Sequence, residues 1–190
     1  ENFYGETKLQ SEQILEETYK NNKDWKIVVL RYFNPIGSHH SYLIWDDPLG
    51  KPENLMPNIL EAVNSHKTSL KIFGSDYDTF DGTPVRDFIH VEDLINGHVL
   101  ALNFLEKSKK DTFEIFNLGN GKGLSVLQLV KSFEEINQVK VSIEFAEKRK
   151  GDLPIYFSSA EKIYKKLGWK PKFSVEDMCK SSWEFHKNNK

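Results

Sequence analysis

Hydrophobic positions recur along this chain with two periods, one typical of helices and one typical of strands. Residues that favour helix, with apolar positions three or four apart, occupy 4–19, 55–65, 91–106, 126–135, 159–168 and the end of the chain from 174. Continuous or alternating apolar runs predict strands at 25–33, 70–74, 85–91, 113–118 and 139–146. Because strands and helices alternate throughout, the pattern predicts an α/β fold with a mostly parallel sheet.

Polar residues mark several ends of these predicted elements. Asn54, Ser125 and Ser174 each directly precede a helical stretch and can cap it. Residues 38–53 lack a clear period and form a loop that is long for a compact domain. We therefore expect this loop to serve a function.

Composition narrows the class of protein. The chain has 190 residues, 28% of them charged, and a net charge of −2, so no strong field draws it to nucleic acid or to a membrane surface. Its one cysteine, Cys179, excludes an internal disulfide and fits a reducing compartment, so we expect a cytoplasmic protein and an unreactive, buried thiol. The chain opens at Glu1 with a helix almost at once, which is typical of the middle of a domain, and we expect an incomplete chain.

Tyr4 and Lys8 are the first candidates for chemistry. Residues four apart on a helix share a face, so the phenol and the ammonium can reach one reacting group together. An ammonium favours the ionised form of a neighbouring tyrosine, whose pKa is otherwise near ~10. The pair therefore fits a general base with its activator. The alternative from this spacing alone is a solvated helix face.

Four further features bear on ligands. Asn34 follows a predicted strand, where open α/β sheets bind ligands, although an asparagine before proline also suits a turn. Arg86 and Arg149 suit bidentate binding of a diphosphate or, alternatively, surface ion pairs. The glycine cluster 119–123 lacks the last glycine of a dinucleotide fingerprint, which favours a backbone loop near a ligand over a pyrophosphate site. The six histidines have no metal-ligand spacing, so we predict no metal site.

Several blocks of residues together resemble one family over essentially the whole chain. They are Tyr4-Gly5-x-x-Lys8, Arg31-Tyr32-Phe33-Asn34, Asn54-Leu55-Met56-Pro57, Asp81-Gly82-Thr83-x-Val85-Arg86-Asp87 and Gly151-Asp152-Leu153-Pro154. In this order they resemble the UDP-glucose 4-epimerases, which are extended short-chain dehydrogenase/reductases. The resemblance runs from the family's catalytic tyrosine to near its C-terminus, so the chain looks like the C-terminal half to two-thirds of such a protein.

The resemblance implies a fold and an activity. Residues 1–35 would be a remnant of the NAD-binding Rossmann domain, whose sheet is parallel. Residues 36–190 would mainly form a smaller α/β domain that binds the UDP-sugar, with about 85–120 returning to the Rossmann domain. The family interconverts UDP-glucose and UDP-galactose in galactose metabolism by NAD-dependent oxidation and re-reduction at C4 of the sugar. We expect a homodimer at full length and an inactive chain at 190 residues.

The resemblance also implies residue roles. Tyr4 would be the catalytic base, Lys8 would assist it, and both would contact NAD together with Tyr32. The residues implied to bind the UDP-sugar are Asn34, Asn54, Leu55, Phe73, Arg86, Val126, Arg149, Asp152 and Tyr156. A tyrosine at the position of Tyr156 is typical of members that exclude N-acetylated sugars.

Two departures from the family pattern leave alternatives open. The sequence lacks the family's glycine-rich NAD fingerprint, and residues 42–45 read Tyr-Leu-Ile-Trp where the family has a glycine-containing loop. These bulky residues could reshape the mouth of the site, mark a divergent segment or bind a partner. The alternative functions are a sister nucleotide-sugar decarboxylase or dehydratase, and a non-catalytic UDP-sugar-binding fragment.

Overall fold

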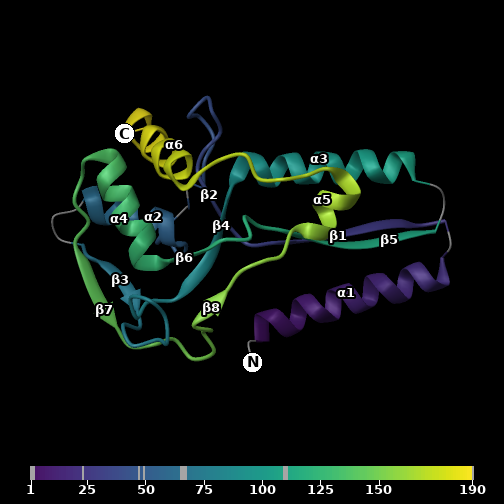
Figure 1. The fold of residues 1–190 in the computed structure, drawn as a ribbon, viewed down its shortest axis with the longest axis horizontal. Helices are drawn as coiled ribbons and strands as arrows, with labels where there is room; N and C mark the ends of the chain where they lie inside the picture. Colours follow the sequence, from purple (N-terminus) through teal and green to yellow (C-terminus); the bar gives the residue numbers. More distant parts are fainter. Residues whose placement is uncertain are drawn as a thin grey trace.

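A computed structural model describes residues 3–22, 24–46, 48, 50–64, 68–108 and 111–189. Over these ranges six helices alternate with eight strands (Figure 1). The helices are α1 (Phe3–Asn21), α2 (Leu55–Asn64), α3 (Val91–Lys107), α4 (Val126–Asn137), α5 (Glu161–Leu167) and α6 (Val175–Asn188). The strands are β1 (Lys26–Tyr32), β2 (Asn34–Ile36), β3 (Leu70–Phe73), β4 (Val85–His90), β5 (Thr112–Leu118), β6 (Gly123–Ser125), β7 (Ile143–Ala146) and β8 (Ile155–Tyr156).

Most predicted elements are confirmed, and the differences lie at short strands and at element ends. The strand expected over 139–146 starts only at Ile143, and the helix expected from Ser159 starts at Glu161, after Ala160, which makes no side-chain cap. Ser65, the expected end of α2, lies outside the described residues. The strands β2, β6 and β8 were not predicted, because two or three residues are too few to show a period.

The first of two regions is the β1/β5 layer, which consists of β1, β5, α1, α3 and α5. β1 and β5 are parallel, with a register that runs from Lys26 opposite Thr112 to Tyr32 opposite Leu118. Helix α1 covers one face of this pair, and α3 and α5 cover the other (Figure 1). The core between the strands and α3 and α5 includes the buried Phe116 and Trp169.

The second region is the α4/α6 lobe, which consists of α2, α4, α6 and the parallel pair β3 and β7. Ser125 and Ser174 begin α4 and α6 with complete capping boxes, as predicted. Phe133, Met178 and Cys179 are fully buried in the core of this lobe. Burial raises the pKa of the Cys179 thiol to about 12, which agrees with the expectation of a buried, unreactive cysteine.

Strand β4 joins the two regions. It pairs with β2 and β8 in parallel and with β6 antiparallel. Successive side chains of a strand point to opposite faces, and here Phe88 belongs to the core of the lobe while Ile89 belongs to the core of the layer. The residues that flank this strand are therefore held by both cores. Among the described residues we find no helix with the length and apolar character that crossing a membrane requires.

Candidate functional site

Arg86 lies at the start of β4 and is the most constrained charged residue of the candidate site. Its Nη1 donates to the carbonyl oxygens of Val85 at 2.9 Å and Leu153 at 2.8 Å. Its Nη2 lies 3.7 Å from Oδ1 of Asp152, which is beyond hydrogen-bond distance. Burial lowers the pKa of Arg86; Asp152 acts against this shift, while the positive charge of Arg149 adds to it. Arg86 is therefore influenced by a second cation as well as by one carboxylate, and a pair of neighbouring arginines suits an anionic ligand.

Arg149 and Asp152 belong to the segment that leads into β8. The Arg149 guanidinium lies 4.0 Å from the centroid of the Phe73 ring, at the end of β3. The backbone N–H of Asp152 donates to the carbonyl of Arg149 at 3.2 Å, which holds the two residues in one turn. Four of the residues that the sequence singled out, from three separate stretches, are thus brought together here.

Tyr156 extends this group of residues along β8. The parallel pairing of β4 with β8 places Tyr156 opposite Arg86. The Tyr156 ring is 52% exposed and lies 5.0 Å from the ring of Phe33, centroid to centroid. Tyr156 is therefore a surface aromatic beside the arginine and not a core residue.

Val126 is held beside β4 by the start of α4. Its backbone N–H donates to the carbonyl of Pro84 at 3.0 Å. The preceding Ser125 donates from Oγ to the carboxylate of Asp81. Burial on its own would raise the pKa of Asp81, but the hydrogen bonds from Ser125 and Thr83 outweigh it and lower that pKa. An ionised Asp81 thus fixes the end of α4 that carries Val126.

Tyr4 and Lys8 form a second group on α1. The Lys8 ammonium lies 5.1 Å from the centroid of the Tyr4 ring, so the two residues share a helix face as their spacing predicts. The Tyr4 side chain is 67% exposed, and Tyr32 at the end of β1 is 56% exposed. Asn34, the first residue of β2, is also exposed.

Arg31 lies between the two groups. It makes a bidentate ion pair with Glu12 of α1, with one hydrogen bond, from Nε to Oε1, of 2.7 Å. This hydrogen bonding raises the pKa of Arg31, and the Tyr156 phenol shifts it in the same direction. Arg31 therefore has electrostatic contact with α1 on one side and with β8 on the other.

Asn54 and Leu55 stand at the start of α2. The side-chain amide of Asn54 donates to Oδ2 of Asp46 at 2.8 Å, and the backbone carbonyl of Asn54 accepts from the backbone N–H of Asn58 at 3.3 Å. A hollow of about 280 Å³ borders this position. It is lined by Asp46, Pro48, Gly50, Lys51, Glu53, Asn54 and Pro57. The amide of Asn54 is thus held at the rim of an open space.

Asp87 is a residue whose part in this arrangement the sequence did not reveal. Its buried carboxylate accepts from the backbone N–H groups of Asn120 at 2.7 Å and Gly121 at 3.1 Å, and from the N–H of Ser158 at 3.0 Å and its Oγ at 2.7 Å. A Cβ at Gly119 would lie 2.4 Å from Oδ2 of this carboxylate. The amides of the glycine cluster therefore bind an internal anion, and this ties the cluster to the segment after Tyr156.

The loop with bulky residues at 42–45 packs on α6. Tyr42 has a φ of 57°, a conformation that favours glycine, and its carbonyl accepts from Nδ2 of Asn189 at 3.2 Å. The Trp45 ring lies 5.2 Å from the ring of Phe185. Leu43 and Ile44 remain 71% and 67% exposed. The loop is anchored at both ends, and its apolar tip faces outward.

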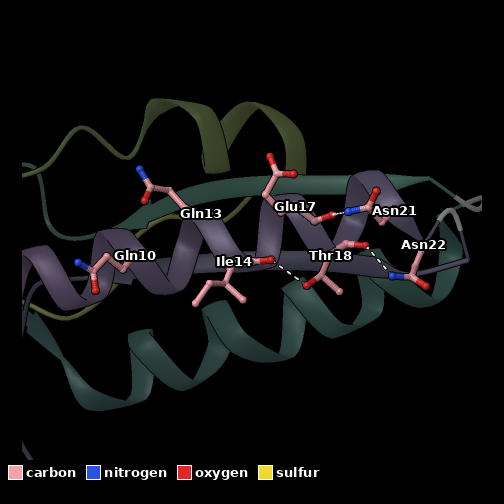
Figure 2. A pocket seen from close by; sticks show the side chains of 7 residues that line it. All are labelled: Gln10, Gln13, Ile14, Glu17, Thr18, Asn21 and Asn22. Carbon is pink, nitrogen blue, oxygen red and sulfur yellow. Dashed lines mark hydrogen bonds between the residues drawn. The ribbon is translucent and has the colours of Figure 1, made fainter.

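A larger hollow of about 600 Å³ runs along the second half of α1 (Figure 2). It is lined by Gln10, Gln13, Ile14, Glu17, Thr18, Asn21 and Asn22. Several of these polar side chains bond back to the helix: Thr18, Asn21 and Asn22 each donate to the carbonyl four residues earlier (Figure 2). We regard this surface as a solvated helix face, because it holds none of the residues grouped above.

Comparisons with known proteins identify the family and the fold of the chain. The profile described as "Epimerase: NAD dependent epimerase/dehydratase family" matches residues 1–119. UDP-glucose 4-epimerase 2 of Arabidopsis thaliana is 44% identical over 188 residues, which is 99% of this chain and 53% of that protein. The crystal structure of a UDP-glucose 4-epimerase from Bifidobacterium longum with NAD+ and UDP has a TM-score of 0.92 and 39% identity, covering 99% of this chain and 55% of that one.

A second solved structure is equally similar in fold. The UDP-glucose-4-epimerase of Stenotrophomonas maltophila, with NAD and formylated UDP-arabinopyranose bound, has a TM-score of 0.92 and 42% identity. That match covers 97% of this chain and 55% of the other. The present chain thus spans about half the length of the curated relatives it matches.

Proposed function

This chain belongs to the NAD dependent epimerase/dehydratase family, and from that premise we propose that it carries the UDP-sugar-binding part of a UDP-glucose 4-epimerase. The activity proposed is the interconversion of UDP-glucose and UDP-galactose by NAD-dependent oxidation and re-reduction at C4. We assign residues 1–35 and about 85–120 to the NAD-binding domain and the rest of 36–190 mainly to the nucleotide-sugar-binding domain, with Arg86 contacting the nucleotide from the start of β4. In support of this division, β1, α3 and β5 pack around one core and α2, α4 and α6 around another.

The observation that carries the proposal is the group formed by Arg86, Arg149 and Asp152. Arg86 is partly buried, its Nη2 lies 3.7 Å from Oδ1 of Asp152, beyond hydrogen-bond distance, and the charge of Arg149 acts on it. A diphosphate supplies the negative charge that two neighbouring arginines require. We assign the ribose hydroxyls to the carboxylate of Asp152, which lies on the same turn as Arg149.

The chemistry belongs to Tyr4 and Lys8. We propose that the Tyr4 phenolate accepts the proton of the sugar 4-hydroxyl and that the Lys8 ammonium stabilises this phenolate by its charge. Bound NAD would supply the hydride chemistry at C4, with Tyr4, Lys8 and Tyr32 as the residues of this chain that would contact it. The exposed Tyr4, Lys8 and Tyr32 fit contacts to its nicotinamide end. The sequence has no Gly-x-Gly-x-x-Gly segment to cradle the pyrophosphate.

A tight anchor and a loosely held sugar make this reaction physically reasonable. The 4-keto sugar must turn over between loss and return of hydride, while the nucleotide stays bound. A diphosphate clamped by two arginines provides the anchor, and the exposed Tyr156 and Asn34 contact the hexose without enclosing it. We further propose that the whole enzyme is cytoplasmic. We also propose that it is a homodimer, which sedimentation of the full-length protein would test.

Binding of UDP to the 190-residue chain is the test of this proposal. Calorimetric titrations with UDP, UMP and uridine should give affinities that fall in that order, because each step removes a phosphate that the arginines bind. Equal affinity for UDP and uridine would contradict the assignment of the arginines. The same chain should not retain NAD, and stoichiometric NAD or turnover of UDP-galactose would overturn the proposed division. A non-catalytic UDP-sugar-binding protein is distinguished by adding the N-terminal half of a relative and assaying UDP-galactose.

Tyr156 should decide which sugars this chimera accepts. An N-acetyl group needs space that the phenol ring occupies, and the ring is supported by Phe33. We expect strong discrimination against UDP-N-acetylglucosamine, and we expect Tyr156→Cys to admit this sugar at little loss of activity on UDP-glucose. The measurement is kcat/KM for both substrates in both proteins. Equal values for the two substrates in the unmutated chimera would end this hypothesis.

A further inference from the structure

A cluster outside the proposed active site combines two imidazoles and a carboxylate. One nitrogen of His39, one nitrogen of His40 and one carboxylate oxygen of Glu92 all lie within 4.8 Å of one another. Nδ1 of His40 lies 3.2 Å from Oε1 of Glu92. In a tetrahedral zinc site with bonds of about 2.0–2.1 Å, ligand atoms are separated by roughly 3.3 Å. Two of the three groups are therefore already at ligand spacing, and a nitrogen of the third lies within 4.8 Å of both.

The fold explains why distant residues meet here. β2 and β4 are parallel neighbours, with Ile36 opposite His90. His39 and His40 follow β2, and Glu92 lies in the first turn of α3, which follows β4. The carboxyl ends of parallel strands lie at one edge of a sheet, so the two segments emerge side by side. Sequence spacing could not reveal this, because 52 positions separate His40 from Glu92.

The backbone that carries the histidines is fixed before any ligand arrives. The buried Ser38 donates from its N–H to Oγ of Ser181 at 3.2 Å, and from its Oγ to the Ser181 carbonyl at 2.8 Å. The N–H of His40 donates to Oε1 of Glu92 at 2.6 Å. The histidines and the carboxylate are thus held together by backbone contacts as well as by their side chains.

Ser41 orients the ring of His39. Nδ1 of His39 lies 2.8 Å from Oγ of Ser41 and accepts a hydrogen bond from the backbone N–H of Ser41 at 3.2 Å. Because Nδ1 accepts here, the proton of the neutral ring is on Nε2. Binding of a metal ion at Nε2 requires that the proton move to Nδ1, where Oγ of Ser41 can accept it.

We propose that His39, His40 and Glu92 bind one divalent transition-metal ion of the zinc type, with water completing its coordination. Two imidazoles and one carboxylate are a ligand set that Zn²⁺ takes in proteins. The ion links the start of the loop after β2 to the first turn of α3. Since the same loop contains Asp46, which accepts a hydrogen bond from Asn54, the link bears on a segment that reaches the proposed substrate residues. The competing view of the cluster is an ion pair between His40 and Glu92 without a metal.

Titration of untagged protein with Zn²⁺, and with Co²⁺ as a spectroscopic probe, tests the proposal. We expect one ion per chain, a visible Co²⁺ band and a higher melting temperature with Zn²⁺. His40→Gln and Glu92→Gln should each abolish binding, and Ser41→Ala should weaken it by about tenfold or more. His186→Gln on α6 removes a histidine elsewhere and should leave metal binding unchanged.

Two results would overturn the site. One is the absence of stoichiometric binding to the unmutated protein, which leaves the ion pair only. The other is binding that survives both His40→Gln and Glu92→Gln, since the ion would then sit elsewhere. Circular dichroism of each variant without metal separates loss of the site from loss of the fold. Glu92→Gln keeps the size of the side chain, so the fold should be retained.

Discussion

The β1/β5 layer and the α4/α6 lobe differ most in how their helices are held. None of the 19 residues of α1 is buried, and its Leu9 and Ile14 are 53% and 66% exposed. In the lobe, Phe133 and Met178 are fully buried, and α4 and α6 both begin with capping boxes. The proposed base thus stands on an open helix, whereas residues that flank the proposed nucleotide site stand on a closed core. Binding and catalysis should therefore be separable in this chain.

The layer also presents apolar rows on a second helix. Ile95, Val99 and Leu102 of α3 are 56%, 49% and 62% exposed. What holds α1 on the layer includes the Arg31–Glu12 ion pair and the Tyr19–Phe113 ring contact, with centroids 5.4 Å apart. Surface ion pairs contribute about 0–1 kcal/mol, so α1 is tethered far less firmly than α4 or α6. Substitutions in the two regions should consequently have different effects.

The largest difference is expected from Tyr4→Phe. In a chimera with the N-terminal half of a relative, this change should lower kcat by about 10²–10⁴-fold, because a general base contributes that much. UDP affinity of the 190-residue chain should not change, since Tyr4 is assigned to the 4-hydroxyl of the hexose and UDP carries no hexose. The measurements are steady-state kinetics of the chimera and calorimetry of the chain. A near-normal kcat would show that another residue is the base.

The second-largest difference between the two regions is expected in the free energy of unfolding of core variants. Phe133→Ala in the lobe should lower the free energy of unfolding by about 3–5 kcal/mol, because it opens a cavity in a fully buried site. Ile14→Ala on α1 should lower it by no more than about 0.5 kcal/mol, because that side chain is 66% exposed. Urea unfolding followed by circular dichroism measures both. Similar losses in the two variants would mean that α1 is packed as firmly as the lobe.

Two arginines provide a matched pair for binding. Arg86→Ala should weaken UDP affinity by roughly 10- to 150-fold, since a hydrogen bond to a charged group contributes about 1.5–3 kcal/mol. Arg31→Ala removes the same group from the layer, where Glu12 already pairs it, and should leave UDP affinity unchanged. An unchanged affinity in Arg86→Ala would assign this arginine a structural role, consistent with its bonds to two carbonyls.

The sequence foretold the long elements of both regions because their periods are strong. The amphipathic pattern of 91–106 became α3, and the apolar runs at 25–33 and 113–118 became the parallel pair β1 and β5. The short strands beside the site, β6 and β8, could not be foreseen, because their pairing with β4 is a tertiary contact. Strand propensity cannot identify a segment of only two or three residues.

The sequence predicted single residues of the candidate site, where they resemble the family, but not how those residues are arranged. Motifs point to Arg86, Arg149 and Asp152, but not to the register that places Tyr156 opposite Arg86. Asp87 was passed over, since nothing local reveals that a strand aspartate will accept from amides 33 and 34 positions away. The glycine cluster resembled a ligand loop for the same reason: its partner is an internal carboxylate. The periodicity of a sequence does not reveal hydrogen bonds between residues that are far apart along the chain.

The smallest effect concerns the hydroxyl of Tyr77, a buried polar group in the region around β3. Tyr77 is 8% exposed, and its hydroxyl has no hydrogen-bond partner among the described residues. A buried polar group without a partner costs about 1–3 kcal/mol, so Tyr77→Phe should raise the free energy of unfolding by about 1 kcal/mol. The contact between Lys148 and the ring, at 4.7 Å, survives the change. Tyr164→Phe is the control in the layer, because that ring is 55% exposed and its loss of a hydroxyl should shift stability by less than about 0.5 kcal/mol. Urea unfolding measures both, and a destabilised Tyr77→Phe would mean that the hydroxyl is satisfied by a bound water.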